Sequence, residues 1–444
     1  MRSATTSTSA RRTWPSRAAK SRRRASFFDL RMQMNHQIDI FAAGAQRLQM
    51  TESIELTIQS MQAYGPAHDH WGIAWSGGKD STATLTIVCW LIDTGRITAP
   101  KTLTVFYADT RQELPPLAIS ALKIMDELRD RRIQVEVVRA PLDKRFMVYI
   151  LGRGVPPPNN NTLRWCTRQI KIDPMEEALR QRLEGVDGGI LMITGVRQGE
   201  SAIRDRRIEM SCGKDGAECG QGWYQQVLPN ARGLRGRIAT LAPLLHWRVC
   251  HVWEWLKHWA PEADFGDWST RAIADAYGGD EAEELNARTG CIGCPLAQEE
   301  KALETVLRSS QWSYLAPLRG IKPLWRELRE PQHRLRKPGL ERLKDGSIAK
   351  NPQRLGPLTF DARLMALDRI LSIQTECNEI ARAGGRPLID LIDDEEEARI
   401  RELIAAQTWP QGWEGDEPTG DVVLDVVYAN GAVQPRLFSE EDAT

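Results

Sequence analysis

The stretch WGIAWSGGKDS, residues 71–81, decides the fold, and it passes from an apolar strand into a polar turn. Residues 72–75 are apolar and predict a buried strand, and the apolar run 83–92 predicts a helix packed on that strand. Gly77 and Gly78 lack a Cβ, so the turn can bring backbone N–H groups close to phosphate oxygens. The start of the following helix adds unpaired N–H donors and the positive end of the helix dipole. The stretch therefore predicts a phosphate-binding loop.

The side chains of this loop complete the predicted anion site. Lys79 supplies a mobile positive charge, and Ser76 and Ser81 supply hydroxyl donors. The pattern is not a Walker P-loop, because Lys79 is followed by Asp80 and the position five before Gly78 is not glycine. It resembles the PP-loop of the ATP pyrophosphatase and sulfonucleotide reductase superfamily. That resemblance implies nucleotide binding, with ATP as the cofactor, by Ser76, Gly77, Gly78, Lys79, Asp80 and Ser81, and catalytic roles for Lys79 and Asp80.

The composition is that of a globular protein with more than one domain. A length of 444 residues predicts two or three domains, and 41% hydrophobic and 27% charged residues are ordinary values for a soluble chain. The formal net charge is zero, so any contact with nucleic acid must come from local basic patches. No apolar run is long enough to cross a bilayer, so we expect no membrane partner. Without a signal-peptide segment, the cysteines indicate reduced thiols and a cytoplasmic location.

The N-terminal residues 1–35 are predicted to form a disordered basic extension. Lysine and arginine are frequent in residues 1–25, and acids are absent from them. Such a segment is compatible with a targeting peptide, with an arm that touches nucleic acid, or with a solvated extension upstream of the true start, which we favour. Met32, Met34 and Met50 are alternative starts.

The order of predicted elements indicates an α/β fold. Strands are expected at 101–107, 133–138 and 188–195, and helices at 36–64 and 117–131. This alternation predicts a parallel sheet with helices on both faces, of the adenine nucleotide alpha-hydrolase-like PP-loop class, followed by a mainly helical C-terminal region with a Cys cluster. The predicted divisions are a PP-loop domain at 36–260, a Cys-containing region at 261–328, a basic segment and helical region at 329–408, and a tail with a short hairpin at 409–444.

Ligands of parallel sheets bind at the carboxyl ends of the strands, and two further polar runs begin there. Residues 109–115, DTRQELP, resemble the Asp-Thr-x-x-Glu-x-Pro segment of sulfonucleotide reductases and DndC-like proteins. The resemblance implies a catalytic role for Asp109, and such an acid could hold Mg²⁺ or a ribose hydroxyl, or could simply cap the next helix. Residues 195–204 resemble the Gly-[Val/Leu]-Arg segment of the same branch. Gly195, Arg197 and Arg204 are therefore expected to bind nucleotide, with Arg197 also catalytic.

Cys166 lies in a basic run, residues 159–174. Arg164, Arg168 and Lys171 would share one helix face, and that positive field would favour the Cys166 thiolate. The alternative is an inert thiol beside a basic surface. The run resembles an element of DndC, the DNA phosphorothioation protein, and implies sulfur chemistry at Cys166. Adenylylsulfate reductases place two adjacent cysteines here, and this chain has only one.

The remaining cysteine pairs predict a metal centre. Cys291 and Cys294 form a C-x-x-C motif that can hold zinc or an iron–sulfur cluster, although redox motifs share the spacing. Cys212 and Cys219 form a second, glycine-rich pair. The DndC resemblance implies a [4Fe–4S] cluster on Cys291 and Cys294, then Cys166, then one of Cys212 and Cys219. In a second arrangement both pairs bind the cluster, or zinc as the lesser possibility, and Cys166 is free. The other cysteines, Cys89, Cys250 and Cys377, are interpreted as core or incidental residues.

These observations support three functional hypotheses. The preferred one is a DndC-like ATP pyrophosphatase that adenylates an oxygen of its substrate, with DNA favoured, before sulfur insertion. It implies a cysteine desulfurase or other sulfur donor and other phosphorothioation-type subunits as partners. The alternatives are a phosphoadenylyl-sulfate or adenylyl-sulfate reductase, and a non-catalytic nucleotide-sensing or DNA-binding subunit. The basic segment 329–354 is the candidate contact with a nucleic-acid backbone, and the Trp-rich run 244–259 is expected to pack in the core.

Overall fold

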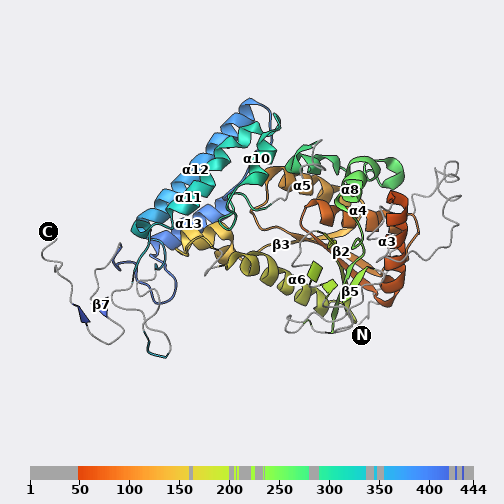
Figure 1. The fold of residues 1–444 in the computed structure, drawn as a ribbon, viewed down its shortest axis with the longest axis horizontal. Coiled ribbons are helices and arrows are strands. Elements are labelled where there is room, and N and C mark those ends of the chain that lie inside the picture. The colour runs from red at the N-terminus through yellow and green to blue at the C-terminus, as the bar shows by residue number, and fades with distance from the viewer. Residues whose placement is uncertain are drawn as a thin grey trace, which may run out of the picture.

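The computed structural model describes most of the chain from residue 49 to residue 419 (Figure 1). The described residues are 49–159, 164–199, 205–206, 208–209, 222–225, 234, 236–279, 290–336, 345–347, 355–419, 426–427 and 433–434. The N-terminal extension and residues Arg204, Cys212 and Cys219 lie outside them.

A six-stranded sheet forms the centre of the first lobe. Its strand order is β3-β2-β1-β4-β6-β5, and all neighbours are parallel except the edge pair β5 and β6. The strands are β1 His70–Trp75, β2 Thr102–Ala108, β3 Gln134–Val138, β4 Ile190–Ile193, β5 Trp223–Gln225 and β6 Ile238–Ala242. The prediction of a mostly parallel α/β sheet is confirmed, and the antiparallel edge strand was not foreseen.

Helices cover both faces of the sheet, because its strands are apolar on both sides. On one face α4, α5 and α8 share a core with Ile73 and Val105, and α6 packs on the other face against Phe106 (Figure 1). The elements of this lobe are α3 Met50–Tyr64, η1 Gly65–Ala67, α4 Lys79–Asp93, α5 Pro115–Asp130, η2 Leu142–Lys144, η3 Val148–Gly152, η4 Arg168–Ile172, α6 Asp173–Glu184, α8 Val249–Glu254, η5 Trp255–Trp259, η6 Ala263–Phe265 and η7 Arg271–Tyr277.

The tryptophan-rich run belongs to this core, as predicted. Trp247, Trp253 and Trp255 are buried, and the Trp255 indole N–H donates to the hydroxyl of Thr86 in α4 at 2.9 Å. These rings therefore hold α8 and η5 against α4 and are not available for base stacking.

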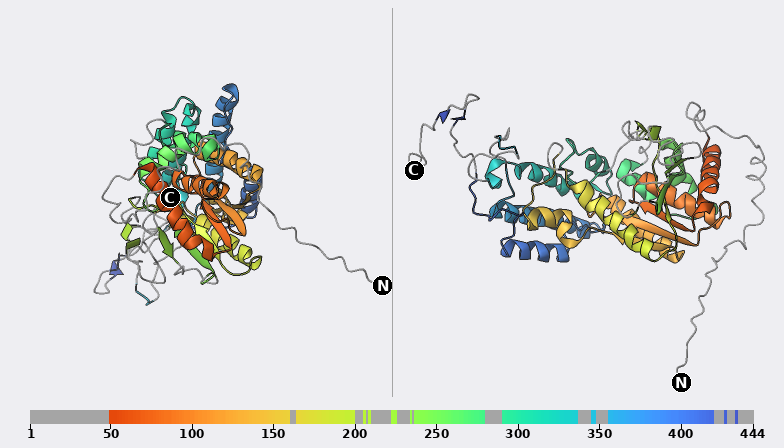
Figure 2. Two further views of the ribbon diagram at one scale, coloured as in Figure 1. Left: turned by 90° about the vertical axis from the view of Figure 1, so that its right-hand side faces the viewer. Right: turned by 90° about the horizontal axis from the view of Figure 1, so that it is seen from below.

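The second lobe is helical and lies beside the sheet (Figure 2). It contains α10 Lys301–Leu307, η9 Ser313–Gly320, α11 Ile321–Glu327, η10 Pro331–His333, α12 Phe360–Ala383 and α13 Asp394–Ala405. Its core includes residues of η3, so the two lobes are joined by packing as well as by the chain. Arg363 of α12 is fully buried and donates to the carbonyl oxygens of Leu151, Gly152 and Thr408.

The structure bears on two predictions for the C-terminal part of the chain, a short hairpin and a basic segment that contacts nucleic acid. The short strands β7 Val426–Val427 and β8 Val433–Gln434 pair antiparallel, as a hairpin requires, although the turn between them lies outside the described residues. In the basic segment, Arg334 and Arg336 are buried, and Arg334 donates to the carbonyl oxygens of Leu355 and Gly356. These two arginines are therefore not open to a nucleic-acid backbone. Among the described helices, none combines the length and apolarity needed to span a bilayer.

A half-buried histidine makes the stability of the first lobe pH-dependent. The Nε2–H of His246 donates to the Ser53 carbonyl at 2.9 Å, and burial lowers the pKa of His246 from 6.5 to about 4, with His251 adding to the decrease. Below pH 6.5 the unfolded chain binds a proton at this residue that the folded chain does not. Lowering the pH from neutral to about 5 should therefore cost about 2 kcal/mol of unfolding free energy through His246. Urea denaturation at both pH values checks this.

The matched variant is His246→Gln, whose amide can still donate to the Ser53 carbonyl but does not titrate. Its loss of stability on acidification should be smaller than that of the wild type by about the same 2 kcal/mol. Equal losses in both proteins would contradict a neutral, half-buried His246.

Candidate functional site

The predicted phosphate-binding loop lies between β1 and α4, with a shape that is set by its own serines. Gly77 has φ +73°, a left-handed conformation, and Gly78 is the extended N-cap of α4. The Ser81 hydroxyl donates to the Gly78 carbonyl at 3.1 Å and accepts the Ser76 backbone N–H at 3.3 Å. The loop therefore wraps over the first turn of α4 and directs the helix N-terminus toward the carboxyl edge of the sheet.

The neighbouring strand β4 brings a second predicted run against this loop. A Cβ on Gly195 would lie 2.8 Å from the backbone carbon of Asp80 and 2.8 Å from the Ser81 nitrogen, so only glycine permits this approach. The strand order reverses between β1 and β4, because β1 connects to β2 on one side and β4 lies on the other. Ligands of open parallel sheets bind at such a reversal.

Three charged side chains meet where these two runs touch. The Arg197 Nε lies 2.5 Å from Asp80 Oδ1, and the Lys79 Nζ lies 2.9 Å from Asp80 Oδ2. Arg197 is buried and also donates to the Trp247 carbonyl at 3.2 Å. Asp80 therefore orients two cations at the loop, and the net charge of the trio is positive, which suits a phosphate ligand.

Tyr277, at the end of η7, completes the loop, and nothing in its sequence context indicated this role. Its hydroxyl accepts the Lys79 backbone N–H at 3.2 Å, and the Lys79 ammonium lies 5.1 Å from the centre of its ring. The tyrosine therefore contacts both the backbone and the side chain of the central lysine.

The run after β2 forms a compact acidic loop beside the phosphate-binding loop. Asp109 pairs with Arg139, with Oδ2 2.9 Å from Nε, and accepts the Arg111 N–H at 3.0 Å. Glu113 accepts from the Thr110 hydroxyl at 2.5 Å and is half-buried, and loss of solvation raises the pKa of Glu113. The acids thus hold the loop together, in line with a capping role, while Asp109 remains at the carboxyl end of β2.

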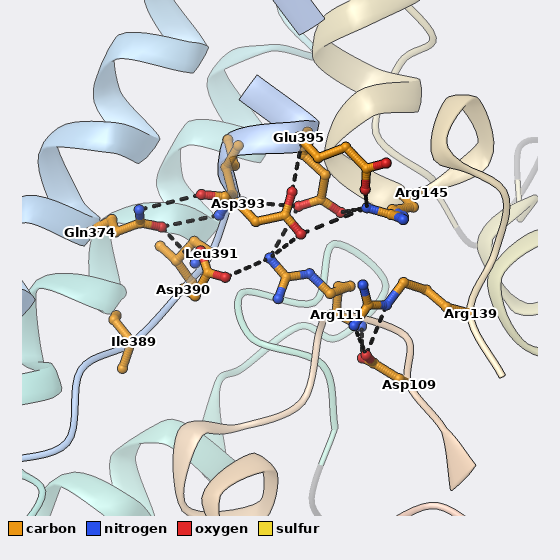
Figure 3. Close-up of polar contacts among 12 residues, drawn as sticks. Asp109, Arg111, Arg139, Arg145, Gln374, Ile389, Asp390, Leu391, Asp393 and Glu395 are labelled. Atoms are coloured by element: carbon orange, nitrogen blue, oxygen red, sulfur yellow. Dashed lines mark hydrogen bonds and ion pairs between the residues drawn. The ribbon is translucent and has the colours of Figure 1, made fainter. Parts of the chain in front are cut away.

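The acidic loop is also tied to α13 of the second lobe (Figure 3). Arg111 has φ +60°, and its Nη2 lies 3.1 Å from Asp390, 3.3 Å from Asp393 and 3.2 Å from Glu396. Burial lowers the pKa of Arg111, but the carboxylates, Glu396 first, raise it by more. Arg145 joins the same network through Glu395 at 2.9 Å. This connection was not predicted from the sequence, because Arg111 and the carboxylates that it pairs with lie about 280 residues apart.

The C-x-x-C motif lies against the acidic loop. The Ile292 N–H donates to the Gln112 carbonyl at 2.9 Å, and the turn between the cysteines contains Gly293 at φ +57°. Burial first, and then Cys294, Glu113 and Cys166, raise the pKa of Cys291 to about 11, with Lys171 opposing them. Cys166, Cys291 and Cys294 are therefore close enough for each to affect another electrostatically, although they come from distant segments.

The expectation of a stabilised thiolate at Cys166 is wrong for the protein as described. Burial raises the pKa of Cys166, and Arg168 is exposed and pairs with Asp173 at 2.9 Å instead of facing the sulfur. Cys89 and Cys377 are buried core residues, as predicted. Within the described residues, no group of three or more Cys, His, Asp or Glu side chains is arranged tightly enough to hold a metal ion.

Comparisons with known proteins agree with this architecture. Residues 70–260 match the family described as the phosphoadenosine phosphosulfate reductase domain. No curated protein matches the chain. Solved structures that resemble it include a Candida glabrata FMN adenylyltransferase with FMN and an ATP analogue (13% identity, 49% of this chain and 62% of that chain, TM-score 0.30). They also include a Candida auris phosphoadenylyl-sulfate reductase with phosphate (12%, 55% and 97%, 0.32).

A third similar structure is the U34-tRNA thiolase NcsA of Methanococcus maripaludis with its [4Fe–4S] cluster (13% identity, 63% of this chain and 79% of that chain, TM-score 0.30). These likenesses are too distant to assign an activity. The family match covers residues 70–260, which is less than half of the chain, and the mostly parallel α/β sheet with its PP-loop-like turn agrees with it. The specific resemblance to DndC is not among these findings and stays a prediction.

The approach of Gly195 to α4 gives a direct test of the loop. Gly195→Ala places a methyl group against backbone atoms that cannot move aside, so we expect a loss of about 2 kcal/mol in stability and at least about tenfold weaker nucleotide binding. Calorimetric titration with ATP and denaturant unfolding measure both effects. Gly185→Ala is the matched control, because a Cβ there meets only the Arg182 carbonyl at 3.7 Å. Wild-type affinity in Gly195→Ala would contradict the proposed geometry.

The connection to α13 predicts a second, separable effect. Glu396 is 1% exposed, so Arg111→Ala leaves a buried carboxylate with a weaker partner and should cost about 3 kcal/mol of unfolding free energy. Arg401→Ala, which breaks the exposed pair with Glu397 on the same helix, should cost less than about 1 kcal/mol. Equal losses measured in urea would show that the Arg111 network does not hold the lobes together.

Proposed function

We propose that this protein is a PP-loop ATP pyrophosphatase that acts in sulfur transfer. ATP binds on residues 76–81, an oxygen of the substrate attacks the α-phosphorus, and pyrophosphate leaves. A sulfur nucleophile then attacks the substrate atom that carries the adenylated oxygen. The bond from that atom to the oxygen breaks, AMP leaves with the oxygen, and the new bond to sulfur takes its place. Adenylation is useful because oxygen is a poor leaving group until it carries a phosphoryl ester.

The loop supports the first step. The helix N-terminus and the backbone of Gly77 and Gly78 can accept the phosphates, and Lys79 and Arg197 offset the charge that develops on the leaving pyrophosphate. Mg²⁺ is expected with the triphosphate, and Asp109, at the carboxyl end of β2, is the carboxylate that the sequence offered for it. Asp109 pairs with Arg139, so metal binding there would compete with that ion pair.

The observation that carries the proposal is the meeting of thiols with the nucleotide loops. The C-x-x-C turn bonds to the acidic loop through Ile292 and Gln112, and Cys166 shares an electrostatic environment with both cysteines of the motif. A protein that only sensed nucleotides would not need three thiols at the carboxyl edge of its sheet.

The donor set is compatible with an iron–sulfur cluster. Three thiols are soft ligands, and Cys166, Cys291 and Cys294 affect one another electrostatically. Among the described residues no three donors are arranged to hold a metal ion, so cluster binding would require these thiols to move together. These three would hold a [4Fe–4S] cluster, with Cys212 or Cys219 as the proposed fourth ligand. When bound, the cluster would supply an iron site for activating sulfur.

DNA remains the proposed substrate, with a cysteine desulfurase or other sulfur donor and phosphorothioation-type subunits as proposed partners; these rest on the resemblance to DndC. The reductase alternative gains no support from Cys377, because that thiol is fully buried within α12 and is not presented as a nucleophile.

The products of ATP turnover test the adenylation step. With α-labelled ATP, Mg²⁺, DNA and a sulfur donor, the wild type should release AMP and pyrophosphate, and Lys79→Ala should reduce this rate by about a hundredfold or more. Lys257→Ala, which changes a lysine of η5 outside the loop, is the control. ADP as the product, or sulfite release from phosphoadenylyl sulfate, would contradict the proposal.

Metal analysis tests the sulfur centre independently of turnover. Anaerobically purified protein should contain about four iron and four acid-labile sulfide per chain, and each of Cys166→Ser, Cys291→Ser and Cys294→Ser should lower both. Cys250→Ser is the matched control, because that half-buried thiol is outside the group. Stoichiometric zinc without iron, or full iron in all three variants, would overturn the assignment.

A further inference from the structure

A cavity of about 210 Å³ lies directly behind the C-x-x-C motif. One wall is the segment 295–298, which follows Cys294, and the other is formed by Lys322, Trp325, Arg326 and Arg329 of α11 and the turn after it. It is separate from the phosphate-binding loop, which contributes no residue to its lining.

The cavity is positively charged. The described residues that line it include three cations and no acid. Lys322 and Arg326 act to lower the pKa of Glu300, which does not line the cavity, although burial raises that pKa by more. The Glu300 carboxylate already accepts the Gly293 N–H at 2.5 Å. Burial, and then the neighbouring Arg326, lower the pKa of Arg329.

The cationic side chains are anchored by the backbone around the cavity. Arg329 Nη2 donates to the carbonyls of Pro158 at 2.8 Å and Pro295 at 2.9 Å, and Arg326 Nη2 donates to the Gln298 carbonyl at 3.0 Å. Carbonyl oxygens fix these guanidinium groups in place but do not neutralise their charge. They are therefore held in position before any ligand arrives, which lowers the entropy lost on binding.

Two buried donors in the lining have no acceptor among the residues that the structure describes. Arg329 Nε and the indole Nε1 of Trp325 are shielded from solvent without a hydrogen bond, and Trp325 is 1% exposed. A buried N–H without an acceptor is costly and rare in folded proteins, and it calls for an acceptor. Two such donors beside three cations favour an anion with several oxygens.

We infer that this cavity binds a tetrahedral oxyanion, a phosphate or sulfate group, beside the C-x-x-C motif. The three cations, two of which are guanidinium groups with several N–H donors, match the charge and the several acceptor oxygens of a tetrahedral oxyanion. A planar carboxylate has fewer acceptor oxygens and would occupy fewer of these donors. The ligand is either an inorganic oxyanion or a phosphate of a nucleic-acid backbone. The site stands whether or not the proposed adenylation reaction is correct.

The test measures sulfate binding in a protein whose phosphate-binding loop is weakened. Equilibrium dialysis of Lys79→Ala with labelled sulfate should show about one equivalent bound. Adding Arg326→Gln and Arg329→Gln should weaken this binding by about tenfold or more. The control adds Arg129→Gln and Arg401→Gln, which remove the same charge from exposed positions, and should stay within about twofold.

Trp325→Phe in the same background guards against misfolding of the arginine variant. It removes a donor that has no partner among the described residues and should weaken sulfate binding by about threefold or more, with native circular dichroism retained. Equal sulfate binding in the cavity variants and in the charge control would overturn the site, as would no binding in the Lys79→Ala protein.

Competition then distinguishes the two sources of the oxyanion. Displacement of sulfate by a short single-stranded DNA, but not by the same concentration of its nucleosides, would assign the cavity to a backbone phosphate. Displacement by inorganic phosphate and not by DNA would assign it to a small anion. Both results support the site. Neither depends on ATP turnover, so failure here and failure of the proposed function can be told apart.

Discussion

The site depends on one close contact between backbones. Where β4 ends, the chain at Gly195 lies against the first turn of α4, at a distance that leaves no room for a side chain. This contact places Arg197 beside Asp80, and Asp80 in turn holds Lys79. The charge pattern of the loop is therefore a consequence of how two parallel strands and one helix meet. A change in the spacing between β1 and β4 would separate the cations before it disturbed the loop itself.

A second constraint comes from the helical lobe. The ion pairs of Arg111 with the start of α13, and the bond from Ile292 to Gln112, both end on the acidic loop after β2. That loop therefore receives support from two C-terminal segments that lie far from it in sequence. It occupies the junction of the nucleotide loops, the cysteine motif and the helical lobe. Because burial makes these charged contacts costly to break, the junction favours one arrangement of the lobes.

The structure carries two separate sets of cations. Lys79 and Arg197 lie at the phosphate-binding loop, and Lys322, Arg326 and Arg329 line the cavity formed with the segment that follows Cys294. The two sets share no residue, so each can be changed by substitution without altering the other.

The sequence alone determined the sheet, the phosphate-binding loop and the packing of the tryptophan run, because each is encoded locally by apolar periodicity and by glycine and lysine at fixed spacing. It also marked the cysteines, but their mutual approach depends on segments more than a hundred residues apart. Only the tertiary structure decided that Tyr277 contacts Lys79, that Arg111 reaches α13, and that Arg334 is buried instead of solvated. Burial and long-range pairing have no local signature, because they arise from the way the chain packs.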